Sequence, residues 1–370
     1  MTSATRAASR AFLDWGGFGL LLALTLAIWA LYGANLGRWP SSPDFGWRTM
    51  YNLGPNVVSQ VFEAGAAVGL RPGDQIVAIN GRTYTTFDEL FFGDLRHGEA
   101  GSVNVYTVRR EGRTLEISVP TGRVGLGAVL WRSGPLFALG LVYILIGVLV
   151  YLMKPHVAES TLFLWMTCLL GISVSLASPA DLIHPTWLYD VRLLSRALTP
   201  AVMVHLALLF PKRRDVLARR PWVACLAYVP SLAIFAFQQA TTTAYWNTPK
   251  SILLLWVGYS VGGVLFFLGM TGWNSLRDAS IITRLQSRVI FVGIVLGFFI
   301  PGFDLLSGLL WRVTLFSDPI LGFGLCFSFF PLSIGYTIVK HDLFAIDTIV
   351  RRTYGYVLSK IGRASCRERV

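Results

Sequence analysis

Eight long apolar runs, each close to the thickness of a lipid bilayer, constrain this chain more than any other feature. A helix needs about 20 mainly apolar residues to cross the hydrocarbon core. Inside that core every backbone polar group must find its partner within the protein. The runs therefore predict a polytopic α-helical membrane protein with about eight transmembrane helices. They extend from about Gly16 to Gly37, Gly134 to Met153, Ser160 to Ser178, Val191 to Phe210, Trp222 to Gln239, Ser251 to Trp273, Val289 to Leu310 and Pro319 to Val339.

A polar segment of a different character, residues 48–122, separates the first two runs. Its apolar residues alternate in "VVSQVF", "QIVAI", "SVNVYTV" and "LEISV", which is typical of half-buried strands. The last two flank "RREGRT" as the arms of a hairpin would. "AGAAVGL" and "TTFDELFFGDL" favour two short helices, the second opened by capping threonines. We expect a small β-rich domain inserted between the first and second transmembrane helices.

Positive charge is concentrated in every second loop between the runs. The formal net charge is +12, and short loops rich in Lys and Arg stay on the cytoplasmic side. With residues 1–15 in the cytoplasm, the short loops on that side hold more cations than the short loops opposite: Lys154, Lys212, Arg213, Arg214, Arg219, Arg220, Arg277, Arg284 and Arg288. The pattern predicts cytoplasmic N- and C-termini and an extracytoplasmic β-rich domain. It also accounts for the charge without a nucleic-acid partner, for which the sequence has no motif.

A cleaved signal peptide is the alternative for the first run, which has a basic start and an apolar centre. Both interpretations export the β-rich domain that follows. We favour an uncleaved helix, because no clean small-x-small cleavage site follows the apolar centre.

The last ten residues, "IGRASCRERV" (361–370), differ in character from the apolar chain before them. They resemble, residue by residue, the translation of a sequencing adapter. We interpret them as a non-native tail, and a native basic tail is the alternative. On this interpretation the natural chain continues beyond about Lys360.

Motifs for catalysis or metal binding are missing from the sequence. The H-E-x-x-H pattern of a zinc-dependent intramembrane protease does not occur, and the cysteines lack the spacing of a metal site. Ser173 and His205 could form a serine-protease pair, but small polar residues in membrane helices mostly serve packing. No ATP-binding glycine box is present. We expect no catalytic residue, metal or cofactor in this chain.

Ionisable residues within the predicted spans are the next candidates, because charge in the membrane is costly and often functional. They are Arg192, Arg196, His205 and Asp304. The arginines could pair with Asp190 or Asp304. For His205, a hydrogen bond between packed helices competes with a direct role in sensing. For Asp304, a satisfied helix-end carboxylate competes with contact to a ligand.

The stretch "GLRPGDQIVAINGR" (69–82) resembles the core motif of bacterial PDZ domains, as do the flanking "VVSQVF" and "VRREGRTLEISV". Gly69 suits a helix end with positive φ, and Asn80–Gly81 suits the next turn. The resemblance implies a PDZ-like fold over residues 48–122, in which the motif is structural. Its residues are Gly69, Leu70, Pro72, Gly73, Asp74, Asn80 and Gly81.

The same resemblance implies a site for an extracytoplasmic peptide or protein. PDZ domains add an extended peptide beside a sheet edge and hold its carboxylate with backbone N–H groups. The residues concerned are Tyr51, Leu53 and Gly54 in the loop "YNLGPN" and Phe87, Leu90 and Phe91 on the following helix. Alternatively the helix residues are ordinary core. Pro55 removes an N–H donor from the loop, so we expect weak or absent binding of free C-terminal peptides.

Two membrane stretches, "LTPAVMVHLALLFPKRR" (199–214) and "PLSIGYTIVKHDLFAIDTIVRRTYGYVLSK" (331–360), resemble the multi-span sensor regions of bacterial signalling proteins. A PDZ-like insert after the first span resembles the arrangement in competence-type quorum-sensing histidine kinases. The resemblance implies location in the bacterial inner membrane and a seven-helix sensor region over residues 134–339. It also implies a cytoplasmic transmitter helix over residues 340–360, for which an amphipathic helix on the inner leaflet is the alternative.

The function implied is the input portion of a two-component signalling protein, cut before its histidine kinase core. The implied partners are the lipid bilayer, an extracytoplasmic peptide or protein, a second copy in a homodimer and, for the full-length parent, a response regulator. ATP and Mg²⁺ belong to the missing kinase core. The alternatives are a PDZ-containing membrane scaffold or protease-associated protein, and the sensor region of a signalling phosphatase or cyclase.

Overall fold

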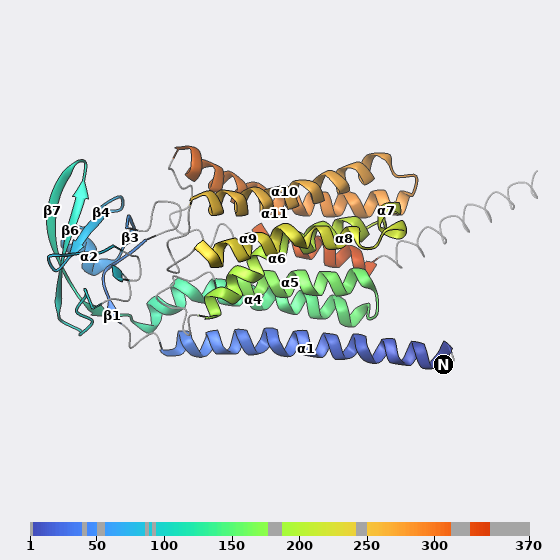
Figure 1. Ribbon diagram of the computed structural model, residues 1–370, viewed down its shortest axis with the longest axis horizontal. Helices are drawn as coiled ribbons and strands as arrows, with labels where there is room; N and C mark the ends of the chain where they lie inside the picture. Colours follow the sequence, from blue (N-terminus) through green and yellow to red (C-terminus); the bar gives the residue numbers. More distant parts are fainter. Residues whose placement is uncertain are drawn as a thin grey trace, which may run out of the picture.

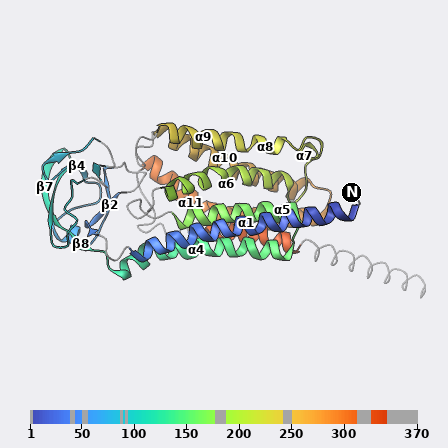
Figure 2. The same cartoon turned by 60° about the horizontal axis from the view of Figure 1, so that its bottom comes forward.

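A bundle of long helices carries a small β-rich module beyond one of its ends (Figure 1). This computed structural model describes residues 3–38, 43–49, 56–85, 89–90, 94–176, 187–241, 250–311 and 326–340. The N-terminus lies at the end of the bundle opposite the β-rich module, and the turned view in Figure 2 shows the same separation. The two parts of the chain that the sequence distinguished are therefore also distinct in space.

The bundle confirms a polytopic helical membrane protein. Seven helices among the described residues contain a stretch long and apolar enough to cross a membrane. Of the eighth predicted span, Pro319–Val339, the structure describes the shorter apolar helix Cys326–Lys340, called helix 326–340 below. The other helices are α1 (Ser3–Arg38), α4 (Leu126–Met153), α5 (Ala158–Ser175), α6 (Trp187–Leu209), α7 (Asp215–Arg219), α8 (Val223–Leu226), α9 (Tyr228–Thr241), α10 (Lys250–Arg277) and α11 (Ile281–Trp311).

Some helices begin earlier than the apolar runs predicted. The first begins at Ser3 instead of near Gly16, and α11 begins at Ile281 instead of near Val289. An apolar run marks only the part of a helix that faces hydrocarbon. Residues such as Arg284 continue the helix where a long cationic side chain can reach water.

Small residues make the closest helix contacts. A side chain on Gly140 of α4 would collide with Ser175 of α5, and one on Gly147 would collide with Thr167. A Cβ on Gly171 would lie only 2.8 Å from the backbone oxygen of Gly140. Hydrocarbon gives no hydrophobic drive for helix association, so close approach through small residues supplies the packing energy instead.

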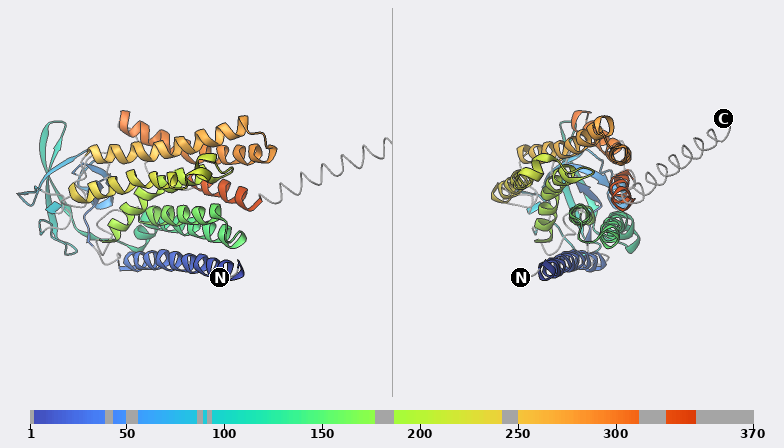
Figure 3. Two further views of the ribbon diagram at one scale, coloured as in Figure 1. Left: turned by 45° about the vertical axis from the view of Figure 1, so that its right-hand side comes forward. Right: turned by 90° about the vertical axis from the view of Figure 1, so that its right-hand side faces the viewer.

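Helix 326–340 also packs through small residues, on two of its sides. Gly293 of α11 faces Ser333, and a Cβ on Gly297 would lie 3.2 Å from the Cβ of Phe330. On the other side, a Cβ on Gly335 would lie 3.0 Å from the Cγ2 of Val150 in α4. Helix 326–340 (red) therefore lies between α11 (orange) and α4, as the end-on view in Figure 3 shows.

The β-rich module contains eight strands and the short helix α2 among its described residues. A four-stranded antiparallel sheet has the order β5-β4-β6-β7, while β2 pairs with β3 and β1 pairs with β8. The elements are β1 (Pro43–Asp44), β2 (Trp47–Thr49), β3 (Val58–Val61), α2 (Glu63–Ala67), β4 (Gln75–Ile79), β5 (Arg82–Thr83), β6 (Val103–Arg110), β7 (Arg113–Pro120) and β8 (Gly122–Arg123).

The predicted strands and hairpin are present. Strands β6 and β7 pair from Val103 opposite Pro120 to Arg110 opposite Arg113. The two residues between them, Glu111 and Gly112, both have positive φ, which the tight turn of a two-residue hairpin requires. Alternate residues of these strands enter a core built from Trp47, Val58, Leu70, Ile76, Ile79, Leu90, Tyr106, Val108, Ile117 and Val119.

Two glycines bring α2 against the strand region that precedes β2. The N–H of Phe62 donates to the backbone oxygen of Gly46 over 2.8 Å. A Cβ on Gly46 would lie 2.8 Å from the nitrogen of Gly65. A Cβ on Gly65 would in turn collide with the backbone oxygen of Gly46. Backbone atoms cannot move aside as a flexible side chain can, so this contact excludes any side chain at Gly65.

We expect Gly65→Ala to destabilise the β-rich module by about 2 kcal/mol, a typical cost of overpacking. Alanine in place of a helical glycine otherwise stabilises by roughly 1 kcal/mol, so the collision decides the sign. Hydrogen exchange of module peptides in the full chain measures the effect. Gly122→Ala is the control, because its Cβ would meet nothing nearer than 3.8 Å. Equal exchange in both variants would contradict the prediction.

Candidate functional site

Two chain connections join the β-rich module to the bundle, and they are paired with each other. Strand β1 follows α1 in the chain, and β8 precedes α4. These strands pair antiparallel, with Pro43 opposite Arg123 and Asp44 opposite Gly122. The module is therefore closed at its base, and a movement of that base reaches α1 and α4 together.

The helices that leave this base pack against one another. Leu36 of α1 packs against Val124 and Val129 at the start of α4. Two turns further into the bundle, the rings of Trp29 and Phe137 stack with centroids 4.0 Å apart and an interplanar angle of 14°. We call the β1–β8 pair and these α1–α4 contacts the stem. It is the candidate site for passing a change in the module to the bundle.

A buried ion pair fixes the module on the side of the predicted turn motif. The Arg110 guanidinium donates to both carboxylate oxygens of Asp74, each over 2.7 Å. It also donates to the backbone oxygen of Gly69 over 2.8 Å. The N–H of Arg71 donates to Asp74 over 2.9 Å. Arg110, at the end of β6, thus joins Gly69, which follows α2, to Asp74, which directly precedes β4.

These contacts change the acidity of Asp74, whose side chain is 1% exposed. Burial raises the pKa of the carboxyl. The hydrogen bonds from Arg110 and Arg71 and the Arg110 charge oppose burial and leave the pKa below its ordinary value. The carboxylate is therefore the form that the folded module stabilises.

A second polar network holds residues 94–102 against the sheet. The Asn104 side chain, 1% exposed, accepts a bond from the His97 N–H over 2.7 Å and donates to the His97 carbonyl over 3.0 Å. Asn104 also donates to the Thr121 hydroxyl and accepts from Asn80. These buried polar groups are paired, so the network specifies one arrangement of the loop.

The residues of the resembling motif build turns and core. Gly69 and Gly73 have φ of +86° and +94°, and Asn80 and Gly81 have φ of +50° and +74°. Leu70 is buried, and Pro72 is exposed beside the turn. Backbone at positive φ favours glycine and tolerates asparagine, which explains these residue types at the four positions.

Of the predicted peptide-binding residues, only Leu90 is described. Its side chain is fully buried among the core residues of the module. The structure therefore places Leu90 in the core, the alternative that the sequence left open, because a side chain without exposed surface offers nothing to a peptide. Tyr51, Leu53, Gly54, Phe87 and Phe91 lie outside the described residues.

Helix α6 carries most of the predicted intramembrane polar residues. His205 is half-buried, and its Nδ1 lies 3.1 Å from the hydroxyl of Tyr228 on α9. The two rings meet edge to face at 6.0 Å. This is a hydrogen bond between packed helices, one of the two roles considered for His205.

The sequence suggested that Arg192 and Arg196 could pair with Asp190 or Asp304, and the structure describes other contacts for Asp190 and Arg196. Asp190 accepts a hydrogen bond from Gln239 of α9 over 2.8 Å. The Arg196 guanidinium lies over the ring of Trp256 on α10, 3.1 Å from its centroid. A flat, weakly hydrated guanidinium gains from an aromatic face where water is scarce, which accounts for the partner found. The side chain of Asp304 lies outside the described residues.

Arg192 is buried in part, and its Nε makes no hydrogen bond within the described part of the chain. Asp190 and His205 are 15 positions apart, or about 22 Å along the helix. Polar contacts to α9 and α10 thus recur along most of the length of α6.

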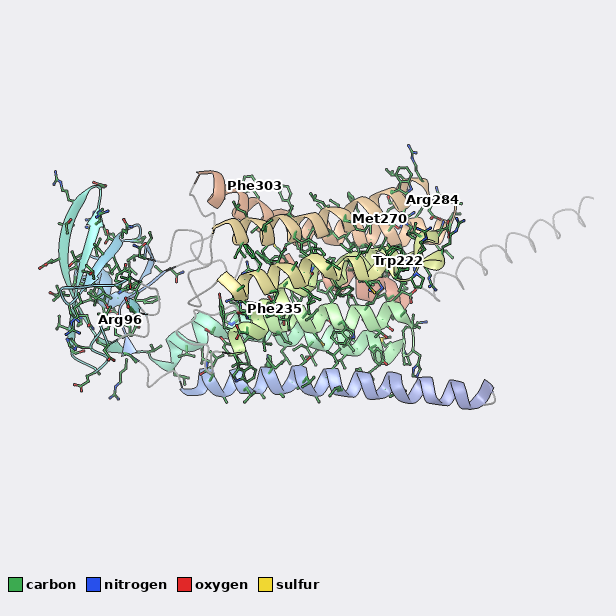
Figure 4. The ribbon with its side chains drawn as sticks, viewed as in Figure 1. Arg96, Trp222, Phe235, Met270, Arg284 and Phe303 are labelled. Carbon is green, nitrogen blue, oxygen red and sulfur yellow. The ribbon has the colours of Figure 1, made fainter. Side chains whose placement is uncertain are left out.

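The end of the bundle opposite the module is basic and cross-linked. Lys212 bonds Asp278 over 2.9 Å, and Arg214 bonds Asn274 over 2.7 Å. Figure 4 shows Arg284, Met270 and Trp222 near this end, with Phe303 near the module and Arg96 within it. The connection after α6 is thereby tied to the turn between α10 and α11.

Asp278 in this turn is more acidic than usual. The N–H of Ser280 donates to its carboxylate over 2.9 Å. This bond lowers the pKa of Asp278, burial raises it, and the Lys212 ammonium lowers it again, so the net shift is downward. The carboxylate stays ionised at neutral pH and holds the turn.

The described residues contain no group of three or more His, Cys, Asp or Glu side chains placed to hold a metal ion. No known protein family, curated protein or solved structure matches the chain. The arrangement of stem, α6 contacts and basic end is therefore what bears on function.

Two of these contacts escaped sequence analysis. Asp74 and Arg110 are 36 positions apart, and Arg196 and Trp256 are 60 apart. The Asp of the "PGD" turn and the "RR" before a hairpin turn were visible, but nothing in the spacing joins them. Only the sheet order places β6 next to β4.

We expect Asp74→Asn to cost the module about 2 kcal/mol at neutral pH, because it weakens the charge-assisted hydrogen bonds from Arg110 to a buried side chain. A lowered pKa contributes stability that is present above the unfolded pKa of about 3.9. That contribution is lost as pH falls through the folded pKa. Wild type should therefore lose module stability in acid below about pH 4, and Asp74→Asn should lose less over the same range.

Hydrogen exchange of peptides from residues 69–79 in the full chain, at pH 7 and after acid incubation, checks this expectation. Arg110→Lys is the matched comparison: it keeps the charge but not the two-pronged geometry, and an intermediate loss is expected. Protection in Asp74→Asn equal to wild type at pH 7 would rule out the proposed role of the pair.

Proposed function

We propose that this chain is the membrane-embedded input portion of a bacterial two-component signalling protein. The β-rich module is a PDZ-like domain outside the cytoplasm, and both termini lie in the cytoplasm. The protein resides in the inner membrane and detects an extracytoplasmic or membrane signal. The output is a cytoplasmic histidine kinase core that follows the transmitter segment, residues 340–360.

The stem carries this proposal. A module tethered by one flexible linker could move without consequence for the bundle. Here β1 pairs with β8, and α1 packs on α4 through Leu36 and Phe137. A ligand that favours one position of the module base then also favours one arrangement of two transmembrane helices, which is the differential interaction that signalling requires.

The far end of the bundle supports the same direction of transfer. Lys340, the last described residue of helix 326–340, lies at this end of the bundle, as does the basic connection after α6 that binds Asp278 and Asn274. In the proposal this helix continues into a paired cytoplasmic segment of a homodimer. ATP and Mg²⁺ act in the kinase core, and a response regulator receives the phosphoryl group.

Reading the gene past codon 360 tests the class of output. An open frame that enters a histidine-bearing dimerisation helix and an ATPase domain supports the kinase. A stop codon within a few residues supports a PDZ-containing scaffold or protease-associated protein instead. A phosphatase or cyclase domain keeps the input role and removes the kinase.

Topology gives a direct prediction. We expect reporters fused at Gly81 and at Ser359 to lie on opposite sides of the membrane, with Gly81 outside and Ser359 inside. The reason is that the cation-rich loops stay in the cytoplasm. Alkaline phosphatase and fluorescent-protein fusions at both positions measure this, each serving as the control for the other. If both fusions were found on the same side of the membrane, the proposal would be wrong.

Stem coupling gives a second prediction. Residues 1–360 are fused to a histidine kinase core and reconstituted, and basal autophosphorylation is measured. Phe137→Ala removes the stacking partner of Trp29, so we expect a change of at least about fivefold, the low end of ordinary allosteric coupling. Leu145→Ala, on the same helix and 55% exposed, should leave the rate unchanged. The same rate in all three proteins would contradict the role of the stem.

A further inference from the structure

A shallow apolar groove lies on the outside of the bundle, between the last turns of α4 and helix 326–340. Its volume is about 430 Å³. Leu149 and Met153 form one wall and Leu332 the other, and Tyr336 and Lys340 line it as well. It lies at the end of the bundle opposite the β-rich module, where α4 finishes at Met153 and the described part of helix 326–340 reaches Lys340.

The groove forms because Gly335 lies among larger residues of the two helices. Gly335 lets helix 326–340 approach α4 until its Cα side nearly touches Val150. The longer side chains of Leu149 and Leu332, on either side of this contact, point outward. Leu149 is 59% exposed and Leu332 is 50% exposed. The floor is therefore close-packed backbone, and the walls are aliphatic.

A cation is held at the polar end of the groove. The Nζ of Lys340 lies 2.6 Å from the hydroxyl of Tyr336 and 5.0 Å from the centre of its ring. The ammonium is thus folded back over the groove. Lys154 directly follows Met153, the last residue of α4, and adds a second positive charge at the same end.

We propose that this groove binds one anionic phospholipid. An acyl chain lies along the aliphatic walls, and the headgroup phosphate accepts hydrogen bonds from Lys340 and Tyr336. Depth and charge both support this occupant: Lys154 directly follows the end of α4, and Lys340 lies at the same end of the bundle, where lipid headgroups are expected. Each lysine near an anionic lipid adds about fivefold to binding. The inference rests on the groove and its cations and does not depend on the signalling function.

A second copy of the chain fits the groove less well. Two copies in one membrane share the same orientation, so a two-fold contact repeats the same patch on both. Lys154 and Lys340 of both copies would then meet at the same end of the interface. Four like charges would oppose the contact, whereas the phosphate of an anionic lipid has the opposite charge.

Native mass spectrometry of the purified full chain tests the proposal, with phosphatidylglycerol and phosphatidylcholine of identical acyl chains as probes. Because two lysines lie at the site, we expect the first phosphatidylglycerol to bind about 25-fold more tightly than phosphatidylcholine. Lys340→Gln should lower this preference to about fivefold, and Lys340→Arg should keep it. Leu332→Trp fills the groove from an exposed position and should weaken the first binding step of both lipids.

Arg277→Gln is the matched control. Arg277 also lies over an aromatic ring, 4.6 Å from the centre of Trp273, and it ends α10 away from the groove. It should leave the preference unchanged. The proposal is overturned if wild type binds both lipids equally, or if Arg277→Gln lowers the preference as much as Lys340→Gln does. A dimer that Leu332→Trp dissociates would also overturn it, since a second copy would then fill the groove.

Discussion

Helices in hydrocarbon gain nothing by hiding leucine from lipid, and the bundle depends on this constraint. Many large apolar side chains point outward, including Leu130 and Leu145 of α4 at 60% and 55% exposed. Association must come from close approach instead. Gly140, Gly147 and Gly171 supply it between α4 and α5, and Gly293 and Gly297 supply it between α11 and helix 326–340. Small residues thus decide which helices are neighbours.

The β-rich module obeys the opposite rule, because it faces water. Its core is aromatic and aliphatic, and the Asp74–Arg110 and Asn104 networks pair several of its buried polar groups. A module held this firmly moves as a unit. With β1 paired to β8 at its base, the stem is the connection to the bundle that the described residues show.

Local patterns in the sequence were enough to predict local structure. The apolar runs predicted the membrane helices, and alternation with turn residues predicted the β6–β7 hairpin and the turn at Asn80–Gly81. Partners across the fold were not predictable, because they depend on which elements become neighbours. Trp256, which Arg196 contacts from 60 positions away, is one such partner. Leu90 had the spacing of either a groove or a core residue, and only its burial separates the two.

Helix α4 links the two ends of the molecule. It runs from Leu126 to Met153, about 42 Å at 1.5 Å per residue. Its first turns belong to the stem through Val129, and its last turns contact helix 326–340 through Val150. A proline at position 135 removes one internal hydrogen bond between these regions, so bending there costs less than elsewhere in the helix. A displacement of the module base thus has a continuous path, through a single helix, to the helix that would lead to the output.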